Sequence, residues 1–187
     1  SYINVYNNYG NLKSDINDTE NAIKLFNQGL NIAEEKNTNP LVILNHLALA
    51  FQSLNRITET IETVNKMLKI DPKNANAHQI LSSIYKYSLT NDETMTHLSQ
   101  MKKILLENNF EDDQEGIISF AIGKAYDDLK DPEMAIKFLS LGNKMMNKKR
   151  NSNITQEINI MNDMKKAFED IDLNIKQKNF SRKLCQP

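Results

Sequence analysis

The residues of this chain that could do chemistry are few and stand far apart. His46, His78 and His97 are the candidate metal ligands among its 187 residues, yet no cysteine or carboxylate lies near them at the spacing of a metal site. The chain also has no Gly-rich phosphate loop, no nucleophile elbow and no HExxH helix. We therefore interpret the three histidines as ordinary polar or packing residues, and we predict no catalytic residue, no metal and no cofactor.

Two groups of acidic residues stand in the second half of the chain. Asp112 and Glu115 have the spacing of a capping box, in which side chains satisfy the free N–H groups at the start of a helix. Asp127, Asp128 and Asp131 follow at the end of the same predicted helix. We interpret these three as a solvated turn that could meet a basic partner.

The basic residues do not indicate a nucleic-acid partner. They cluster at a predicted helix end, where cations interact favourably with the helix dipole, at Lys144, Lys148, Lys149 and Arg150. Nucleic-acid binding would need aromatic side chains interleaved with them, and none occur there. The net charge is only −1 and no apolar run approaches the length of a membrane span, so we predict no membrane partner. The single cysteine, Cys185, fits a reducing compartment, and we predict a cytoplasmic protein.

The spacing of apolar residues predicts the elements that carry these side chains. In residues 41–71 apolar residues recur every three or four positions in two stripes, which predicts two antiparallel helices. Asn55 and Arg56 interrupt the pattern as a turn, and Asp71 with Pro72 ends the second helix. The composition, with five glycines and four prolines, also favours helices.

The same helix pair recurs along the chain. Units start near residues 3, 41, 75 and 116, and further turns are predicted at residues 17–18 and 130–131. In the last of these turns Asp131 is a good N-cap, and Pro132 suits the first helical position. The third unit is the weakest copy, with Leu81, Tyr85 and Leu89 expected on its first helix.

A helix-turn-helix unit of this length resembles the tetratricopeptide repeat, and the resemblance spans residues 3–149. It implies an all-α fold, an α–α superhelix of four units within residues 1–150. The first unit departs from the family pattern at Lys13, where an aromatic residue is expected. The third unit lacks the terminal proline and has Thr94 in place of alanine.

Small residues are predicted where the two helices of a unit cross. Gly10, Ala48, Ser82 and Gly123 occupy this position on the first helices, and Ala22 and Ala135 face them from second helices. A larger side chain there would overpack the crossing, which costs on the order of 1–3 kcal/mol.

The tail is predicted to form a helix over residues 151–175 that caps the last unit. Asn153 would be its N-cap, with Gln156 three residues later. Its apolar stripe comprises Ile154, Ile158, Met161, Met164, Phe168 and Ile171. Residues 176–187 are polar and basic, and we predict that they form a linker.

The family resemblance implies a non-catalytic scaffold that binds a protein or peptide through its concave face, lined by the first helices. The residues predicted to line this groove are Asn7, Asn11, Asn45, Leu49, Gln79, Ser83, Phe120 and Lys124, with Tyr87 and Asp127 near its edge. Asparagine amides could bracket an extended peptide backbone, and Phe120 could anchor an apolar side chain. Recognition of a C-terminal carboxylate would need several cations, and only Lys124 is available. A merely solvated face and a self-association module are the alternatives.

The fourth unit and the tail carry a second resemblance. Residues 120–131 and 138–143, a helix containing Phe168, and residues 180–187 are similar to bacterial proteins in which tetratricopeptide repeats precede a sulfotransferase domain. The resemblance implies a downstream catalytic domain whose phosphate loop holds 3′-phosphoadenylyl sulfate. Those catalytic residues are not in this sequence, so the chain itself would be a non-catalytic arm of such an enzyme.

Overall fold

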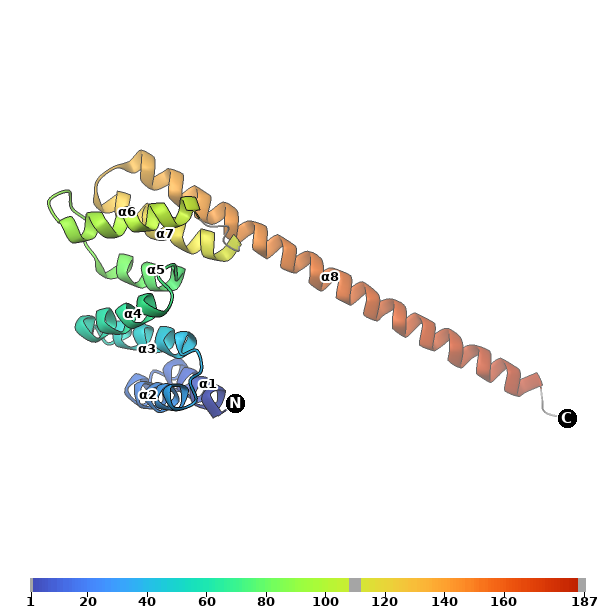
Figure 1. Cartoon of the computed structure of the whole chain (residues 1–187). Helices are drawn as coiled ribbons and strands as arrows, with labels where there is room; N and C mark the ends of the chain where they lie inside the picture. Colours follow the sequence, from blue (N-terminus) through green and yellow to red (C-terminus); the bar gives the residue numbers. More distant parts are fainter. Residues whose placement is uncertain (1, 108–111, 185–187) are drawn as a thin grey trace. The chain divides into compact units, whose positions relative to one another are not determined.

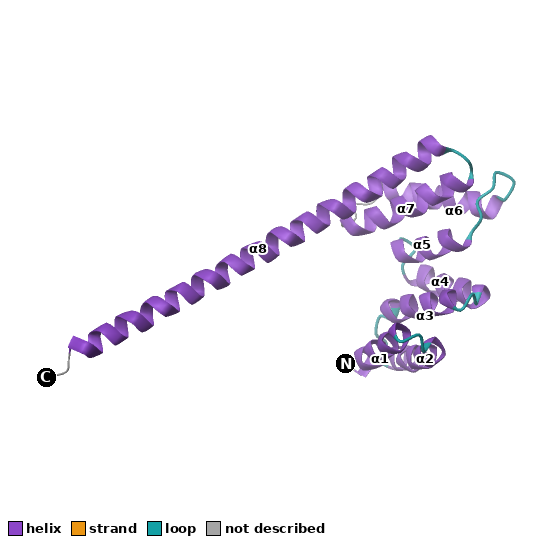
Figure 2. Cartoon of the chain, turned by 180° about the vertical axis from the view of Figure 1, so that it is seen from behind, coloured by secondary structure: helices purple, strands orange, loops and turns teal. Residues whose placement is uncertain are grey.

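The computed structural model of the chain describes residues 2–107 and 112–184, and it is all-α, as predicted (Figures 1 and 2). The described residues form eight helices and no strand. The helices are α1 (Tyr2–Asp15), α2 (Thr19–Glu35), α3 (Leu41–Ser53), α4 (Ile57–Ile70), α5 (Ala75–Ile84), α6 (Asp92–Glu107), α7 (Asp112–Asp128) and α8 (Pro132–Leu184). The chain divides into two compact units, residues 1–145 and 146–187. The four predicted helix pairs lie in the first of them.

Three of the four pairs have the tight turn that was predicted. Asn17, Asn55 and Lys130 each adopt a positive φ, of 61°, 57° and 61°, in the turns after α1, α3 and α7. Asparagine tolerates this left-handed conformation better than most residues do. In the last turn Asp131 accepts a hydrogen bond from the Met134 backbone N–H at 3.1 Å, which confirms the predicted N-cap of α8.

The small residues do lie where helices cross. A Cβ atom added to Gly10 would collide with the ring of Phe26 in α2, and one added to Gly123 would lie 2.8 Å from two side-chain atoms of Leu139 in α8. Ala22 and Ala48 are completely buried. The close approach of paired helices therefore depends on these residues.

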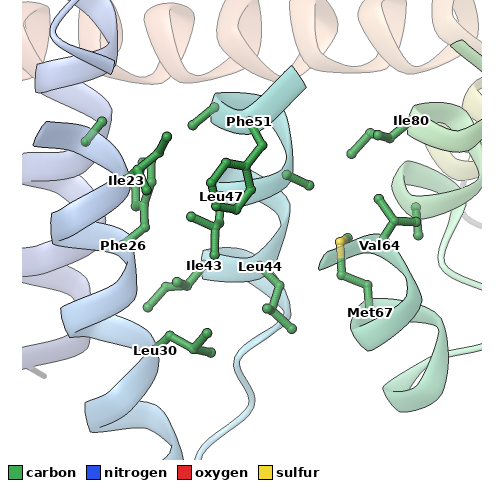
Figure 3. Close-up of a cluster of buried hydrophobic side chains, with 14 of the residues drawn as sticks. Ile23, Phe26, Leu30, Ile43, Leu44, Leu47, Phe51, Val64, Met67 and Ile80 are labelled. Atoms are coloured by element: carbon green, nitrogen blue, oxygen red, sulfur yellow. The ribbon is translucent and has the colours of Figure 1, made fainter. Parts of the chain in front are cut away.

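Two hydrophobic cores stabilise the helix pairs. The first joins α2, α3, α4 and α5, whose apolar side chains point toward one another (Figure 3). Burial of each large side chain in it contributes about 1.5–3 kcal/mol. The second core lies among α6, α7 and the segment between α5 and α6, and includes Tyr87, Leu98, Met101, Ile118 and Ile122.

The third unit departs from the prediction. Helix α5 ends at Ile84, so Tyr85 and Leu89 do not continue it as expected. Instead the chain turns away, and Tyr87 becomes a core residue, 2% exposed, rather than a residue at the edge of a groove. Helix α5 packs against α7, and no contact of comparable extent joins α5 to its own partner α6 in the described structure.

The tail also differs from the prediction. Helix α8 runs without a break from Pro132 to Leu184, so no separate helix begins after Asn153, and residues 176–184 are helical rather than a linker. The physical reason is that residues 143–184 contain neither glycine nor proline to end the helix. The side chains of Asn153, Met164, Phe168 and Ile171 lie outside the described residues, as do residues 185–187 with Cys185. Capping of the last unit stays a prediction.

Candidate functional site on the first helices

The first helices of successive units form one continuous surface, which we call the inner face. Helix α1 contacts α3, α3 contacts α5, and α5 contacts α7. Among the helices that the structure describes, no contact of similar extent joins α2 to α4 or α4 to α6. Side chains of α1, α3 and α5 are therefore close enough to meet across the inner face.

Asn7 and His46 form the first link across this face. The Asn7 Oδ1 lies 2.7 Å from His46 Nδ1, and the imidazole stacks on the ring of Phe26 with centroids 5.7 Å apart. Burial lowers the pKa of His46, which favours the neutral ring. Because the amide oxygen can only accept, Nδ1 donates, and Nε2 of the neutral ring is left as an acceptor.

A cavity of about 250 Å³ lies beside this pair, between α1, α2 and α3. It brings together two predicted groove residues, Asn11 and Leu49, and sequence reasoning missed that His46 would join them. No charged side chain lines it; the lining residues are Asn11, Ser14, Asn17, Thr19, Phe26, His46, Leu49, Ala50 and Ser53. Asn45, also predicted to line the groove, is not among these residues, and its Oδ1 atom is buried without a hydrogen-bond partner.

The second link joins α3 to α5. Gln52 Nε2 donates to Ser83 Oγ at 2.6 Å, and the Ser83 hydroxyl donates to the Ile80 carbonyl at 2.6 Å. Gln79 is exposed on α5. Like the first link, this one is made only of uncharged groups.

The third link contains charged groups. One of them is Lys124, which was predicted to be available to a partner in the groove. Lys124 Nζ donates to the Tyr85 carbonyl and to Asp128 Oδ2, the latter at 2.7 Å, and lies 5.2 Å from the centre of the Tyr87 ring. Asp128 also accepts from Lys86 at 2.7 Å and from the Tyr87 N–H at 3.1 Å. These bonds hold the segment that follows α5, which explains why α5 ends early.

Asp128 is consequently not part of a solvated turn. Its side chain is only 8% exposed. Burial raises the pKa of this carboxyl, but the hydrogen bonds from Lys124, Lys86 and the Tyr87 N–H outweigh it and lower the pKa to about 2. Asp127, one residue earlier, is exposed as predicted.

A second polar cluster, buried between α5 and α6, was not predicted. His78 Nδ1 lies 3.0 Å from His97 Nε2, His78 Nε2 lies 3.0 Å from the Pro72 carbonyl oxygen, and the Tyr87 hydroxyl lies 2.6 Å from His97 Nδ1. The carbonyl can only accept, so His78 Nε2 must donate to it. With both rings neutral, His97 Nε2 then donates to His78, and the Tyr87 hydroxyl donates to His97.

The positions of the two histidines in the repeat could have revealed their burial. His78 and His97 are equivalent to Leu44 and Thr63 of the second unit, which are 2% and 5% exposed. The spacing between His78 and His97 along the sequence did not predict their contact, because the two residues lie on different helices. Across the described residues, no group of three histidines, cysteines or carboxylates could hold a metal ion.

Comparison with known proteins agrees with this geometry. Residues 3–36 and 118–144 match the family model of the tetratricopeptide repeat. Both segments are similar to the tetratricopeptide repeat. The first matched repeat corresponds to α1 and α2, and the second to α7 and the start of α8.

The solved structure described as the crystal structure of MamA protein is similar to this chain. The sequence identity is 18% and the TM-score 0.44, over 80% of this chain and 94% of that one. No curated protein matches the chain. In the described part of the chain, no helix is long and apolar enough to cross a membrane.

The fold thus places the predicted groove residues in different environments. Asn7 contacts His46, Asn11 and Leu49 line one cavity, and Ser83 contacts Gln52, so these four residues take part in separate contacts of the inner face. Phe120 is half-buried and packs against Gly142. A Cβ atom added to Gly142 would lie 2.8 Å from the Phe120 ring. Phe120, Lys124 and Tyr87 are therefore engaged within the fold.

We expect Asp128→Ala to lower the free energy of unfolding by about 2–3 kcal/mol, because it leaves the Tyr87 N–H without its charged acceptor and separates Lys124 from its buried carboxylate. Urea denaturation followed by circular dichroism measures the change. Asp127→Ala, an exposed neighbour on the same repeat, should change the free energy by no more than about 0.5 kcal/mol. Equal effects of the two variants would contradict the role assigned to Asp128.

Proposed function

We propose that the inner face of α1, α3 and α5 binds an extended, uncharged segment of a protein partner. The observation that carries the proposal is the 250 Å³ cavity with its wholly uncharged lining. Tetratricopeptide repeats are typical of protein-interaction scaffolds, and surface pockets with a few convergent polar groups are common binding sites.

The polar groups at this site suit a peptide backbone. His46 lines the cavity, and its Nε2 is left as an acceptor because Nδ1 donates to Asn7, so it could accept a backbone N–H group of the partner. Leu49 is 44% exposed at the cavity and would contact an apolar side chain. A charged side chain would be disfavoured there because it would lose water without gaining an opposite charge.

Selection from a displayed peptide library tests the proposal. We expect the selected peptides to carry an uncharged, partly apolar segment, and Leu49→Glu to weaken their binding at least about tenfold, equivalent to about 1.4 kcal/mol. Leu89→Glu is the matched control, because Leu89 is 76% exposed in the loop after α5, away from this cavity. Peptides that bind Leu49→Glu as well as the original chain would contradict the proposed site.

The second resemblance supports an additional role for the same surface. We propose that these repeats are the arm of a sulfotransferase that presents an acceptor to a downstream domain. The support is the similarity of residues 120–131 and 138–143 to such fusion proteins. Sequencing the gene beyond the codon for Pro187 tests this proposal: a sulfotransferase phosphate loop is expected, and a stop codon or an unrelated sequence would overturn it.

A further inference from the structure

The two helices of the third unit do not pack on each other as those of the first two units do. Extensive contacts join α1 to α2 and α3 to α4. In the described helices α5 instead packs on α7 and α4, and no contact of similar extent joins α6 to α4 or α5. Figure 1 shows α4, α5 and α6 following one another along the repeats. Space is therefore left between α6 and the pair formed by α4 and α5.

Two adjoining cavities occupy this space. One has a volume of about 340 Å³ and the other about 450 Å³. Leu68 of α4 and Gln100 of α6 line both of them, so they form one cleft, which we call the α4–α6 cleft. The buried histidine pair contributes His97 to the smaller cavity and His78 to the larger. The lining residues all lie outside the two segments that match the family model.

The cleft follows one face of α6 along its length. Glu93, His97, Gln100 and Ile104 recur at three- and four-residue steps, and all of them line it. Glu93 and Lys103 lie about 15 Å apart along the helix, at a rise of about 1.5 Å per residue. An extended chain advances about 3.3 Å per residue, so about five residues of a peptide would span this distance. The cleft thus has the length of a short peptide segment.

The two ends of the cleft carry opposite charges. Asp92 and Glu93 line the smaller cavity, and no lysine or arginine of the described chain lines it. Lys73, Lys103 and Glu107 line the larger cavity. Lys103 Nζ lies 4.0 Å from a Glu107 carboxylate oxygen, so one positive charge remains in excess there. This arrangement favours a ligand with a cation at one end and an anion at the other.

The middle of the cleft combines apolar and amide groups. Leu68, Pro72 and Ile104 give the larger cavity an aliphatic wall. The exposed amides of Asn65 on α4 and Gln100 on α6 line the smaller cavity from two helices. Each amide can both donate and accept, as the N–H and C=O groups of a peptide backbone require. A lone ion would leave the aliphatic wall uncovered.

We propose that the α4–α6 cleft binds an extended peptide segment with a basic side chain at one end, an apolar one in the middle and an acidic one at the other end. The basic side chain would lie beside Asp92 and Glu93, and the acidic one beside Lys73 and Lys103. Side chains at the first, third and fifth positions of an extended segment point to the same side, so these three can face the cleft together. The cleft shares no lining residue with the cavity between α1, α2 and α3, so the two proposed sites stand or fall separately.

Titration of the full chain with the peptide Lys-Ser-Leu-Ser-Glu, capped at both termini, tests the proposal. We expect saturable binding with a dissociation constant of about 1 mM or tighter, measured by nuclear magnetic resonance. The ring signals of both His78 and His97 should shift, because each ring lines one of the two cavities. The capped peptide Gln-Ser-Leu-Ser-Gln should bind at least about threefold more weakly, because both ion pairs are lost.

A charge-reversed variant tests the acidic end. Asp92→Lys combined with Glu93→Gln reverses the charge there but keeps an acceptor for the Tyr85 hydroxyl, which donates to Glu93 at 2.7 Å. It should bind the Lys-Ser-Leu-Ser-Glu peptide at least about threefold more weakly than the original chain does, and Glu-Ser-Leu-Ser-Glu more tightly. Glu34→Lys combined with Glu35→Gln is the matched control, because both residues are exposed on α2 and line neither cavity.

A second variant tests the basic end independently. Lys103 is 71% exposed, so Lys103→Glu should keep the fold, and it should bind Lys-Ser-Leu-Ser-Lys more tightly than the original chain does. Circular dichroism should show that all variants keep their helices.

Three results would overturn the proposal. One is the absence of saturable binding at millimolar peptide, and another is binding that leaves both histidine signals unchanged. The third is equal binding of Lys-Ser-Leu-Ser-Lys and Lys-Ser-Leu-Ser-Glu by the original chain, which would mean that only the acidic end takes part.

Discussion

Gly123→Leu is expected to lower the free energy of unfolding by about 2 kcal/mol or more. A Cβ at this position would lie 2.8 Å from Cδ2 and Cγ of Leu139 and 3.2 Å from its backbone nitrogen, so the side chain cannot fit unless α7 and α8 move apart. Overpacking costs on the order of 1–3 kcal/mol or more. Leucine would regain up to about 1 kcal/mol of helix propensity, because glycine is a poor helix former. The steric cost is larger because the leucine adds three more carbon atoms beyond the Cβ.

Thermal unfolding measures this effect, and the neighbouring residue supplies the control. A loss of about 2–3 kcal/mol should lower the melting temperature by roughly 4–12 °C in a chain of this size. Lys124→Ala removes hydrogen bonds to Asp128 and to the Tyr85 carbonyl, but its side chain is 35% exposed, so we expect a smaller shift. Comparable shifts for the two variants would mean that Gly123 is not at the helix crossing.

Acidification is expected to destabilise the chain between about pH 6.5 and pH 4 through the buried histidines. Burial, and then the neighbouring His78, lower the pKa of His97 to about 4, from an ordinary value of 6.5. Burial also lowers the pKa of His78. The unfolded chain therefore binds a proton at a higher pH than the folded chain does. The stability is complete above pH 6.5 and falls as the pH drops toward 4.

The magnitude follows from the same linkage. For His97 alone, lowering the pH from 7 to 5 should reduce the free energy of unfolding by about 2 kcal/mol. Urea denaturation at the two pH values measures it. The double variant His78→Leu, His97→Thr installs the equivalent residues of the second unit, Leu44 and Thr63, and should make the stability less dependent on pH. If this variant kept the full pH dependence, the buried histidine pair would not be its cause.

Local signals explain which parts of the fold could be predicted. Asp131 caps α8 through the Met134 N–H three residues away, and Asn17 and Asn55 turn the chain within their own backbone. The crossing residues Gly10 and Gly123 were equally predictable, because the pattern of small and large residues recurs from unit to unit. Each of these interactions is either close in sequence or repeated.

The candidate site was predicted only in part, for the same reason. Asn11 and Leu49 were assigned to the groove from their places on the first helices, and both line the cavity. His46 was set aside because its role depends on Asn7, which lies 39 residues earlier in the chain. Phe120 and Lys124 were assigned as free groove residues, yet their packing partners make them part of the fold.

The amino-acid sequence by itself determined the all-α class, the helix pairs, their turns and the small residues at their crossings, because these follow from local propensity and periodicity. Only the tertiary structure decided the irregular third unit. There Asp128 binds the Tyr87 N–H from 41 residues away, which ends α5 early, buries Tyr87 and completes the hydrogen-bond chain through His97 and His78. Such contacts depend on how helices that are distant in the sequence pack together, and they cannot be predicted from the spacing of residues along the chain.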